Sequence, residues 1–237
     1  MPIAPSSQTR PVRIRIVDGV LGARRARGTV VVIDVLRAFS VSAYALAGGA
    51  TECRLVREVD EALRLARRLE GALVSAEVNG LPVPGIPISN SPTQVSAADL
   101  NGRVLIQRSS AGTQCTAAAG GADQLFAASL VVARATARAV RAQSPALVTL
   151  VASGIRGRDL EDRACAAYIQ GLLEGRDEDP RALLAPLRAS ERYLRLAAGE
   201  VLGFAPSDLE LSLEPNRFDF ALLAGQDAEG QFLRRLP

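Results

Sequence analysis

The fold is decided by one stretch, Thr29-Val-Val-Val-Ile-Asp34-Val-Leu-Arg37-Ala38. Its first five residues are β-branched and apolar without a break, which predicts a central strand buried on both faces. A carboxylate follows where the strand ends, and the pattern becomes helical from Phe39 to about Gly48. Open α/β sheets bind ligands beyond the carboxyl ends of such strands. We therefore expect Asp34 and Arg37 to lie at a functional site.

Strand-like and helix-like segments alternate along most of the 237 residues. The pattern predicts an α/β fold with three α/β/α layers and a mostly parallel or mixed sheet. No linker separates two cores, so we expect one domain over residues 11–237, preceded by a disordered or loosely packed tail at 1–10. We expect residues 19–28 to form a basic loop and 218–223 a late strand before an irregular end. The proline-rich stretch 77–92 predicts a packed functional loop without regular structure.

The composition excludes several kinds of chemistry. The chain has no histidine, which removes Ser-His-Asp and Cys-His catalysis, histidine-ligated zinc and phosphohistidine chemistry. All 28 basic residues are arginine, so any side-chain cation that binds an anion must be a guanidinium, which can bind in a bidentate way. The three cysteines are far apart, which argues against a disulfide framework.

Partners and location follow from the same composition. Basic residues alternate with acids and only 4% of residues are aromatic, so we expect no nucleic-acid partner, although an arginine-rich binder stays open as an alternative. No apolar run reaches membrane-spanning length and the first residues lack a secretory signal, so we expect a cytoplasmic protein without a membrane partner. A homo-oligomer is compatible with the sequence.

Polar groups stand at the ends of several predicted strands: Asp34 with Arg37, Glu77, the turn 108–113 and the segment 156–162. Parallel strands would place these ends along one edge of the sheet. There, carboxylates could hold a hard divalent cation, and hydroxyls and glycine-flanked helix starts could hold an anion.

Structural explanations stay open for each group. Asp34 could simply pair with Arg37, and Glu77 with a neighbouring arginine. The turn 109–113 could be an ordinary strand–helix connection in which Thr113 caps the helix, and the acids at 159–162 are favoured in a first helical turn in any case.

Taken together, the motifs resemble the 2-phosphosulfolactate phosphatase family, the ComB-like phosphatases. Order and spacing fit over roughly residues 12–175, and the chain departs from the family pattern at Val78, Ala111 and beyond residue 175. The resemblance rests on Val32-Ile-Asp34-Val-Leu-Arg37-Ala38, Glu77, Pro84-Gly85-Ile86, Ser89-Asn90-Ser91-Pro92, Ser109-Ser110-Ala111-Gly112-Thr113, Ser153-Gly154-Ile155-Arg156-Gly157, and Leu160-Glu161-Asp162 with Cys165-Ala166.

The resemblance implies a Mg²⁺-dependent phosphatase with a small anionic substrate. The family reaction converts 2-phospho-3-sulfolactate to 3-sulfolactate and phosphate in coenzyme M biosynthesis. As a hypothesis for the mechanism, Asp34, Arg37 and Glu161 are catalytic, and Mg²⁺ is bound by Asp34, Glu77, Glu161 and Asp162. The residues expected to bind phosphate and the second acid group are Asn90, Ser91, Ser109, Ser110, Gly112, Thr113, Arg156 and Arg158.

Three alternatives to this hypothesis of substrate and mechanism remain open. Asp34 could form an aspartyl phosphate, although Leu36 stands where a second acid would be expected. The chain could be a phosphatase of the same fold that acts on a different phosphorylated acid. It could also be an anion-binding α/β protein without turnover.

Overall fold

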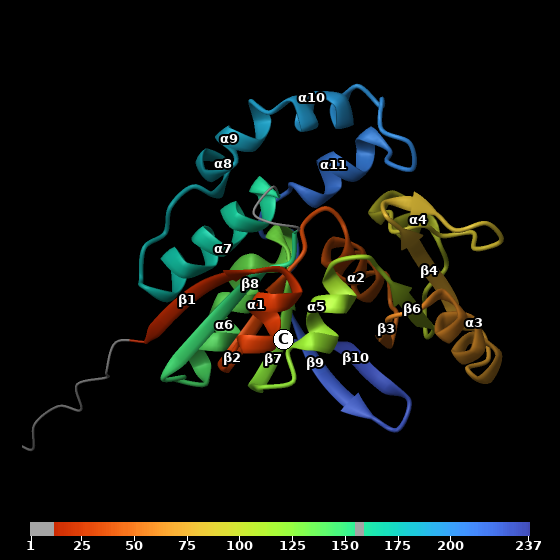
Figure 1. Cartoon of the computed structure of the whole chain (residues 1–237), viewed down its shortest axis with the longest axis horizontal. Helices are drawn as coiled ribbons and strands as arrows, with labels where there is room; N and C mark the ends of the chain where they lie inside the picture. The colour runs from red at the N-terminus through yellow and green to blue at the C-terminus, as the bar shows by residue number, and fades with distance from the viewer. Residues whose placement is uncertain (1–11, 155–158) are drawn as a thin grey trace, which may run out of the picture.

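The computed structural model describes residues 12–154 and 159–237. The expected tail at 1–10 and two expected anion-binding residues, Arg156 and Arg158, lie outside these described residues. Within them, ten strands form one sheet with helices on both faces, in the order β1-β8-β2-β7-β9-β10-β3-β6-β4-β5 (Figure 1). The predicted α/β class with three layers and a mixed sheet is confirmed.

The sheet consists of two groups of parallel strands joined by an antiparallel hairpin. The first group is β1 (Arg13–Asp18), β8 (Leu147–Ala152), β2 (Gly28–Ile33) and β7 (Ala122–Ala128). The second is β3 (Glu52–Val56), β6 (Val104–Arg108) and β4 (Leu73–Val78), with the short β5 (Leu81–Pro82) at the edge. The hairpin is β9 (Ala221–Asp227) and β10 (Gly230–Leu236).

The hairpin corrects the expectation of a single edge that collects the strand ends. The pairings β7–β9, β9–β10 and β10–β3 are all antiparallel, so the two parallel groups run in opposite directions. The polar strand ends therefore meet across the two groups and not along one edge of a parallel sheet. The pattern of the first 175 residues cannot show this, because the reversing strands are the last two in the chain.

Strand β2 has the double burial that its sequence predicts. Val30 and Val32 pack into one core with Phe39 of α2 (Ala38–Ala47). Val31 and Ile33 pack into a second core on the opposite face. The first core also takes in α1 (Gly19–Arg25), α4 (Pro92–Ala97) and α5 (Gly112–Ala118), and the second takes in α6 (Ala133–Ala142) and α7 (Leu160–Leu173). Helix α3 (Val59–Arg68) packs on the second strand group through a smaller cluster, and the 3₁₀ turn Leu130–Val132 precedes α6.

Three local expectations are wrong. The segment expected as a basic loop begins with helix α1, whose Ala23 is fully buried. The proline-rich stretch contains β5 and leads directly into α4, which starts with Pro92 in its first turn and Ser91 as its N-cap. The irregular end expected after residue 223 is strand β10, which follows the turn Asp227–Gly230.

The C-terminal helices form a cap over one end of the molecule. We define the cap as residues 180–212, which contain α8 (Pro180–Leu183), α9 (Ala185–Arg188), α10 (Glu191–Ala197) and α11 (Pro206–Ser212). In Figure 1 these helices, coloured teal to blue, arch across the top of the view above α7 and α2. Leu184, Leu187 and Leu196 anchor the cap in the second core. In residues 12–154 and 159–237, no helix has both the length and the apolar character needed to cross a bilayer.

Candidate active site

A cavity of about 410 Å³ lies between the strand ends and the cap. Five charged side chains line it: Asp34, Glu77 and Asp159 as acids, and Arg37 and Arg192 as cations. Asn90 and Ser110 add polar side chains, and the cap adds an apolar wall formed by Leu196, Val201 and Phe204. The site therefore combines carboxylates, guanidinium groups and hydrogen-bond donors in one cavity.

Asp34 follows β2 directly and is 5% exposed. Its backbone N–H donates to the carbonyl of Ala128, and its Oδ1 accepts a 2.9 Å hydrogen bond from the N–H of Ala38, the first residue of α2. Burial, with the negative charges of Asp159 and Glu77, raises the pKa of Asp34 from 3.8 to about 6. A carboxylate whose charge is disfavoured in this way attracts a cation or a proton.

Asp162 stands behind Asp34 and does not line the cavity. Its Oδ1 accepts from the N–H of Val35 at 2.8 Å, and its Oδ2 accepts from the Ser153 hydroxyl and the Gly154 N–H, both at 3.2 Å. Burial and the charge of Asp34 raise the pKa of Asp162 well above its usual value. These bonds tie the loop after β8 to the loop after β2, so Asp162 shapes the surroundings of Asp34.

Glu161 is 1% exposed and is bound by the cap. Both of its carboxylate oxygens accept from Arg192 Nη1, at 2.7 and 2.8 Å. The same Nη1 lies 3.3 Å from Asp159 Oδ1. Burial raises the pKa of Glu161, and the charge of Arg192 opposes that rise. Glu161 therefore holds the cap to α7 and does not face the cavity.

Glu77, the last residue but one of β4, lines the cavity, but its carboxylate also organises the neighbouring turns. It accepts hydrogen bonds from the N–H and the hydroxyl of Ser110 and from the N–H of Gly80. Arg108 supports the same turn by donating to the backbone carbonyl of Glu77 and to the Ser110 hydroxyl. Glu77 thus connects β4 with the turn after β6.

The four acids expected to hold Mg²⁺ are not assembled as one set. Within the described ranges, no three acidic or cysteine side chains are arranged to hold a metal ion. Asp34 and Glu77 face the cavity together with Asp159, whereas Glu161 and Asp162 are bound elsewhere. Mg²⁺ is commonly bound by one or two carboxylates, with water and substrate phosphate completing its coordination. The carboxylates that face the cavity, Asp34, Glu77 and Asp159, fit an ion held in that way by one or two protein ligands.

The turn after β6 has two different parts. Ser110, one of the residues expected to bind phosphate, lines the cavity together with Ala111. Ser109 and Thr113 are buried and bond to each other: Thr113 N–H donates to Ser109 Oγ at 3.1 Å, and Ser109 N–H donates to Thr113 Oγ1 at 3.0 Å. These two residues therefore have the structural role of an ordinary strand–helix turn. Gly112 lies against Asp34 and lets the turn approach it.

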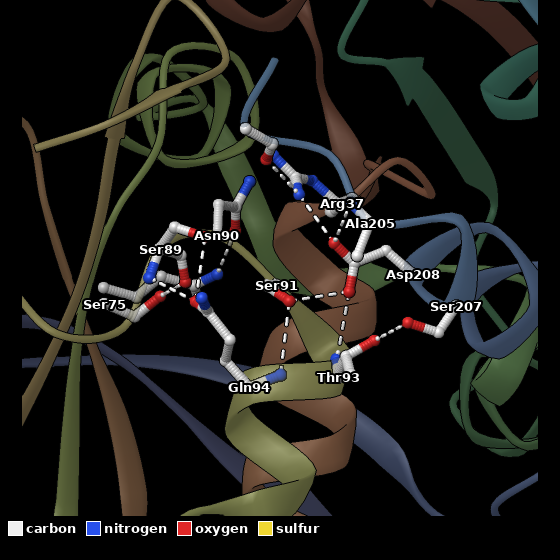
Figure 2. Close-up of polar contacts among 12 residues, drawn as sticks. Arg37, Ser75, Ser89, Asn90, Ser91, Thr93, Gln94, Ala205, Ser207 and Asp208 are labelled. Atoms are coloured by element: carbon white, nitrogen blue, oxygen red, sulfur yellow. Dashed lines mark hydrogen bonds and ion pairs between the residues drawn. The ribbon is translucent and has the colours of Figure 1, made fainter. Parts of the chain in front are cut away.

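Asn90 and Ser91 also differ in position (Figure 2). Asn90 lines the cavity, and its Oδ1 accepts from Gln107 Nε2 at 3.2 Å. The Ser91 hydroxyl caps α4 and donates to Asp208 Oδ1 at 2.6 Å. Asn90 can therefore reach a ligand in the cavity, whereas Ser91 acts on the cap.

Arg37 pairs with the cap and not with Asp34, which sets aside the structural explanation offered for that pair. Its Nη1 donates to Asp208 Oδ2 at 2.7 Å and to the carbonyl of Gly203 at 2.9 Å. Its guanidinium carbon lies 4.5 Å from the centre of the Phe204 ring. The contacts place this guanidinium at the wall of the cavity.

Sequence reasoning missed the residues that the cap contributes. Arg192, Phe204 and Asp208 lie beyond residue 175, where the motifs end, and only the helical pattern of that region was recognisable. Asp159 is one of several acids at the start of a predicted helix, a position that favours acids whatever their role. No local signal distinguishes these residues from solvent-exposed ones.

Comparison with known proteins agrees with these motifs. A family model described as 2-phosphosulpholactate phosphatase matches residues 16–198. A "Probable 2-phosphosulfolactate phosphatase" of Bacillus subtilis (strain 168) is 36% identical over 147 residues, which cover 61% of this chain and 64% of the relative. Proteins with the same name from Carboxydothermus hydrogenoformans and Deinococcus radiodurans are 38% and 35% identical, over 60% and 58% of their own lengths. The matches thus span less than two thirds of each of these relatives.

Proposed function

The chain belongs to the 2-phosphosulpholactate phosphatase family, and on that premise we propose that it hydrolyses the phosphate ester of a small 2-hydroxy acid. The first candidate substrate is 2-phospho-3-sulfolactate, because the relatives are named as probable phosphatases of that compound. The observation that carries the proposal is the buried Asp34 carboxylate, which shares one cavity with Arg37, Asn90 and Ser110. Phosphoryl transfer requires this combination of a carboxylate with hydrogen-bond donors that can bind the anionic phosphoryl group.

Each group has a role that its position supports. Arg37 presents guanidinium donors to an oxyanion, and the Asn90 amide and the Ser110 hydroxyl add neutral donors at the cavity wall. Asp34 would hold Mg²⁺, with Glu77 or Asp159 as a second carboxylate. Bound Mg²⁺ would supply positive charge against the phosphoryl oxygens and activate water. Asp162 keeps the backbone at Val35 in place, which sets the direction of the Asp34 side chain.

A second candidate mechanism makes Asp34 the nucleophile, with an aspartyl phosphate as intermediate. The hydrogen bond from Ala38 fixes one carboxylate oxygen, and the pKa of about 6 leaves the group ionised at neutral pH. Leu36 stands where the second acid of such enzymes is expected, so we place this mechanism second. Isolation of an acid-stable phosphoenzyme that is lost in Asp34→Asn would reverse the order.

The deciding experiment measures phosphate release by the purified full-length chain. The substrates are 2-phospho-3-sulfolactate, 2-phospholactate and p-nitrophenyl phosphate, each with EDTA and with Mg²⁺. We expect Mg²⁺-dependent release from all three substrates, faster from the first two, and none from Asp34→Asn. Phosphate binding without release would favour the non-catalytic anion-binding alternative. Salt-dependent retention on a DNA column without release would favour the nucleic-acid alternative.

Three further expectations stay predictions. They are a role in coenzyme M biosynthesis, a cytoplasmic location and the formation of a homo-oligomer. Activity on 2-phospholactate above that on 2-phospho-3-sulfolactate would move the chain away from the named reaction and toward a different phosphorylated acid.

A further inference from the structure

Asp208 is a fully buried acid in the cap, beyond the residues that the family model matches. Its Oδ1 accepts from the Ser91 hydroxyl at 2.6 Å and from the Thr93 N–H at 3.1 Å. Its Oδ2 accepts from Arg37 Nη1 at 2.7 Å and from the Ala205 N–H at 3.4 Å. Figure 2 shows that these donors surround the carboxylate from three separate segments of the chain.

The charge of Asp208 is maintained despite its burial. Burial opposes ionisation, but the hydrogen bonds from Ser91, Thr93 and Arg37 outweigh it and lower the pKa of Asp208 below its usual value. An ionised, fully bonded carboxylate is a rigid partner for a guanidinium, because its own side chain has no freedom left.

Arg37 is the one of these donors that also lines the cavity. In the part of the chain that the structure describes, its hydrogen bonds use Nη1 alone, toward Asp208 and Gly203. Phe204 covers the guanidinium face. The N–H groups on Nε and Nη2 therefore keep their hydrogen-bonding capacity, in a residue that lines the cavity. A free arginine would lose side-chain entropy when it bound an oxyanion, and Asp208 removes most of that freedom beforehand.

We propose that Asp208 is a positioning residue, which holds the Arg37 guanidinium so that Nε and Nη2 face an anionic group of the substrate. The proposal rests on the proposed function, because it takes Arg37 as an anion-binding group. It extends the active site into the cap and assigns a function to a segment that the motifs leave without one. The competing explanation is that the pair only fastens the cap to the core.

The chain offers a matched control for that competing explanation. Ser207, next to Asp208 in α11, fastens the same helix to the start of α4 through a 2.9 Å contact with the Thr93 hydroxyl. Ser207 does not touch Arg37. If Asp208 only fastens the cap, Ser207→Ala and Asp208→Asn should have the same kind of effect on phosphate binding and kcat/KM. If Asp208 positions Arg37, only Asp208→Asn should weaken them.

The test compares wild type, Asp208→Asn and Ser207→Ala as full-length proteins. Calorimetry measures the binding of inorganic phosphate. Steady-state assays with p-nitrophenyl phosphate and Mg²⁺ give kcat and KM, and thermal unfolding gives the Tm of each protein without ligand. We expect Asp208→Asn to weaken phosphate binding and to lower kcat/KM by about 10- to 100-fold, since small displacements of a binding group have effects of that order. For Ser207→Ala, phosphate affinity and kcat/KM should both stay within about twofold of the wild-type values.

A double-mutant comparison and a crystal structure complete the test. In an Arg37→Met background, adding Asp208→Asn should cause no further loss of kcat/KM, because the residue to be positioned is gone. A further loss would show that Asp208 acts in another way. A crystal structure of Asp208→Asn with Arg37 unmoved would overturn the proposal whether or not the chain is a phosphatase. If wild type neither binds nor releases phosphate, the proposed function fails first and the inference with it.

Should Asp208→Asn fail to fold, Ser91→Ala serves as the milder variant. It removes one hydrogen bond to Asp208 and leaves the ion pair with Arg37 in place. We expect a loss of phosphate affinity that is smaller than that of Asp208→Asn and absent in the Arg37→Met background. An equal loss in both backgrounds would contradict the proposal.

Discussion

Gly112 and Asp34 lie so close together that no side chain fits at residue 112. A Cβ atom there would lie 2.7 Å from Asp34 Oδ2 and 2.9 Å from the Cβ of Ala38. Gly112 begins the helix after β6, and Asp34 directly follows β2, so this contact joins the two oppositely directed strand groups. The glycine is needed at this position because the carboxylate occupies the space of the missing side chain.

Gly112→Ala should therefore displace the Asp34 carboxylate and lower phosphatase turnover by about 100-fold. Overpacking should cost about 1–3 kcal/mol of unfolding free energy without loss of the fold. Gly120→Ala is the matched control, since a Cβ at residue 120 meets no atom within 4 Å. Phosphate release and urea unfolding check both variants, and a wild-type rate for Gly112→Ala would show that the position of Asp34 is not critical.

The pKa of Asp34 predicts a pH dependence of stability in EDTA. Because the folded-state pKa of about 6 lies above the ordinary 3.8, the folded protein binds more protons than the unfolded chain between these values. The Asp34 contribution to the unfolding free energy should therefore fall as the pH rises from about 4 to about 6, by at most about 3 kcal/mol.

Asp34→Asn removes this titration, so its advantage in stability over wild type should grow across the same pH range. Urea unfolding at pH 4, 5, 6 and 7 measures the difference. Asp162 has a raised pKa too and contributes in the same direction. Because the charge of Asp34 helps to raise that pKa, the difference between the two proteins reports the two carboxylates as a coupled pair. Parallel curves for the two proteins would mean that burial does not disfavour the Asp34 charge.

Mg²⁺ should raise the Tm of wild type at neutral pH, because an ion bound only by the folded state stabilises it. Asp34→Asn should lose this response. Glu161→Gln should keep it, since the Glu161 carboxylate is bound to Arg192 and does not face the cavity. Differential scanning calorimetry with EDTA and with a Mg²⁺ series tests both variants. Loss of the response in Glu161→Gln alone would restore Glu161 as a metal ligand.

The same Glu161→Gln protein should be less stable than wild type by about 1–3 kcal/mol in EDTA. The substitution takes a charged partner from Arg192, and hydrogen bonds to charged groups contribute about that much. Glu200→Gln provides a control at an exposed pair in the same region, with a 3.8 Å separation from Arg195. Its unfolding free energy should change by less than about 0.5 kcal/mol.

A fragment limited to the family-matched residues 16–198 should not fold on its own. It lacks β9 and β10, which stand between β7 and β3 and connect the two strand groups. Without them both groups would expose new edges, and the first core would lose Leu222 and Leu233, which are fully buried in it. Circular dichroism and dye binding should show a non-cooperative, partly collapsed chain. Cooperative thermal unfolding of the fragment would contradict this prediction.

Several features could be predicted from the sequence because they depend on near neighbours in the chain. The unbroken apolar run from Thr29 to Ile33 has to be covered on both faces, and the structure covers it so. The acid at its end has to find donors, and the first N–H of the following helix is the nearest one. The α/β class and the position of Asp34 at the site follow from these local constraints.

The partners of the charged groups depended on the tertiary structure alone. Arg37 pairs with a residue 171 positions away, and Glu161 with a residue of the cap whose local pattern says only that it is helical. The direction of the second strand group is set by a hairpin at the end of the chain. Periodicity records which face of an element is buried, because burial repeats with the geometry of the strand or helix. It carries no record of which distant charge meets another, because that is decided by packing the whole chain at once.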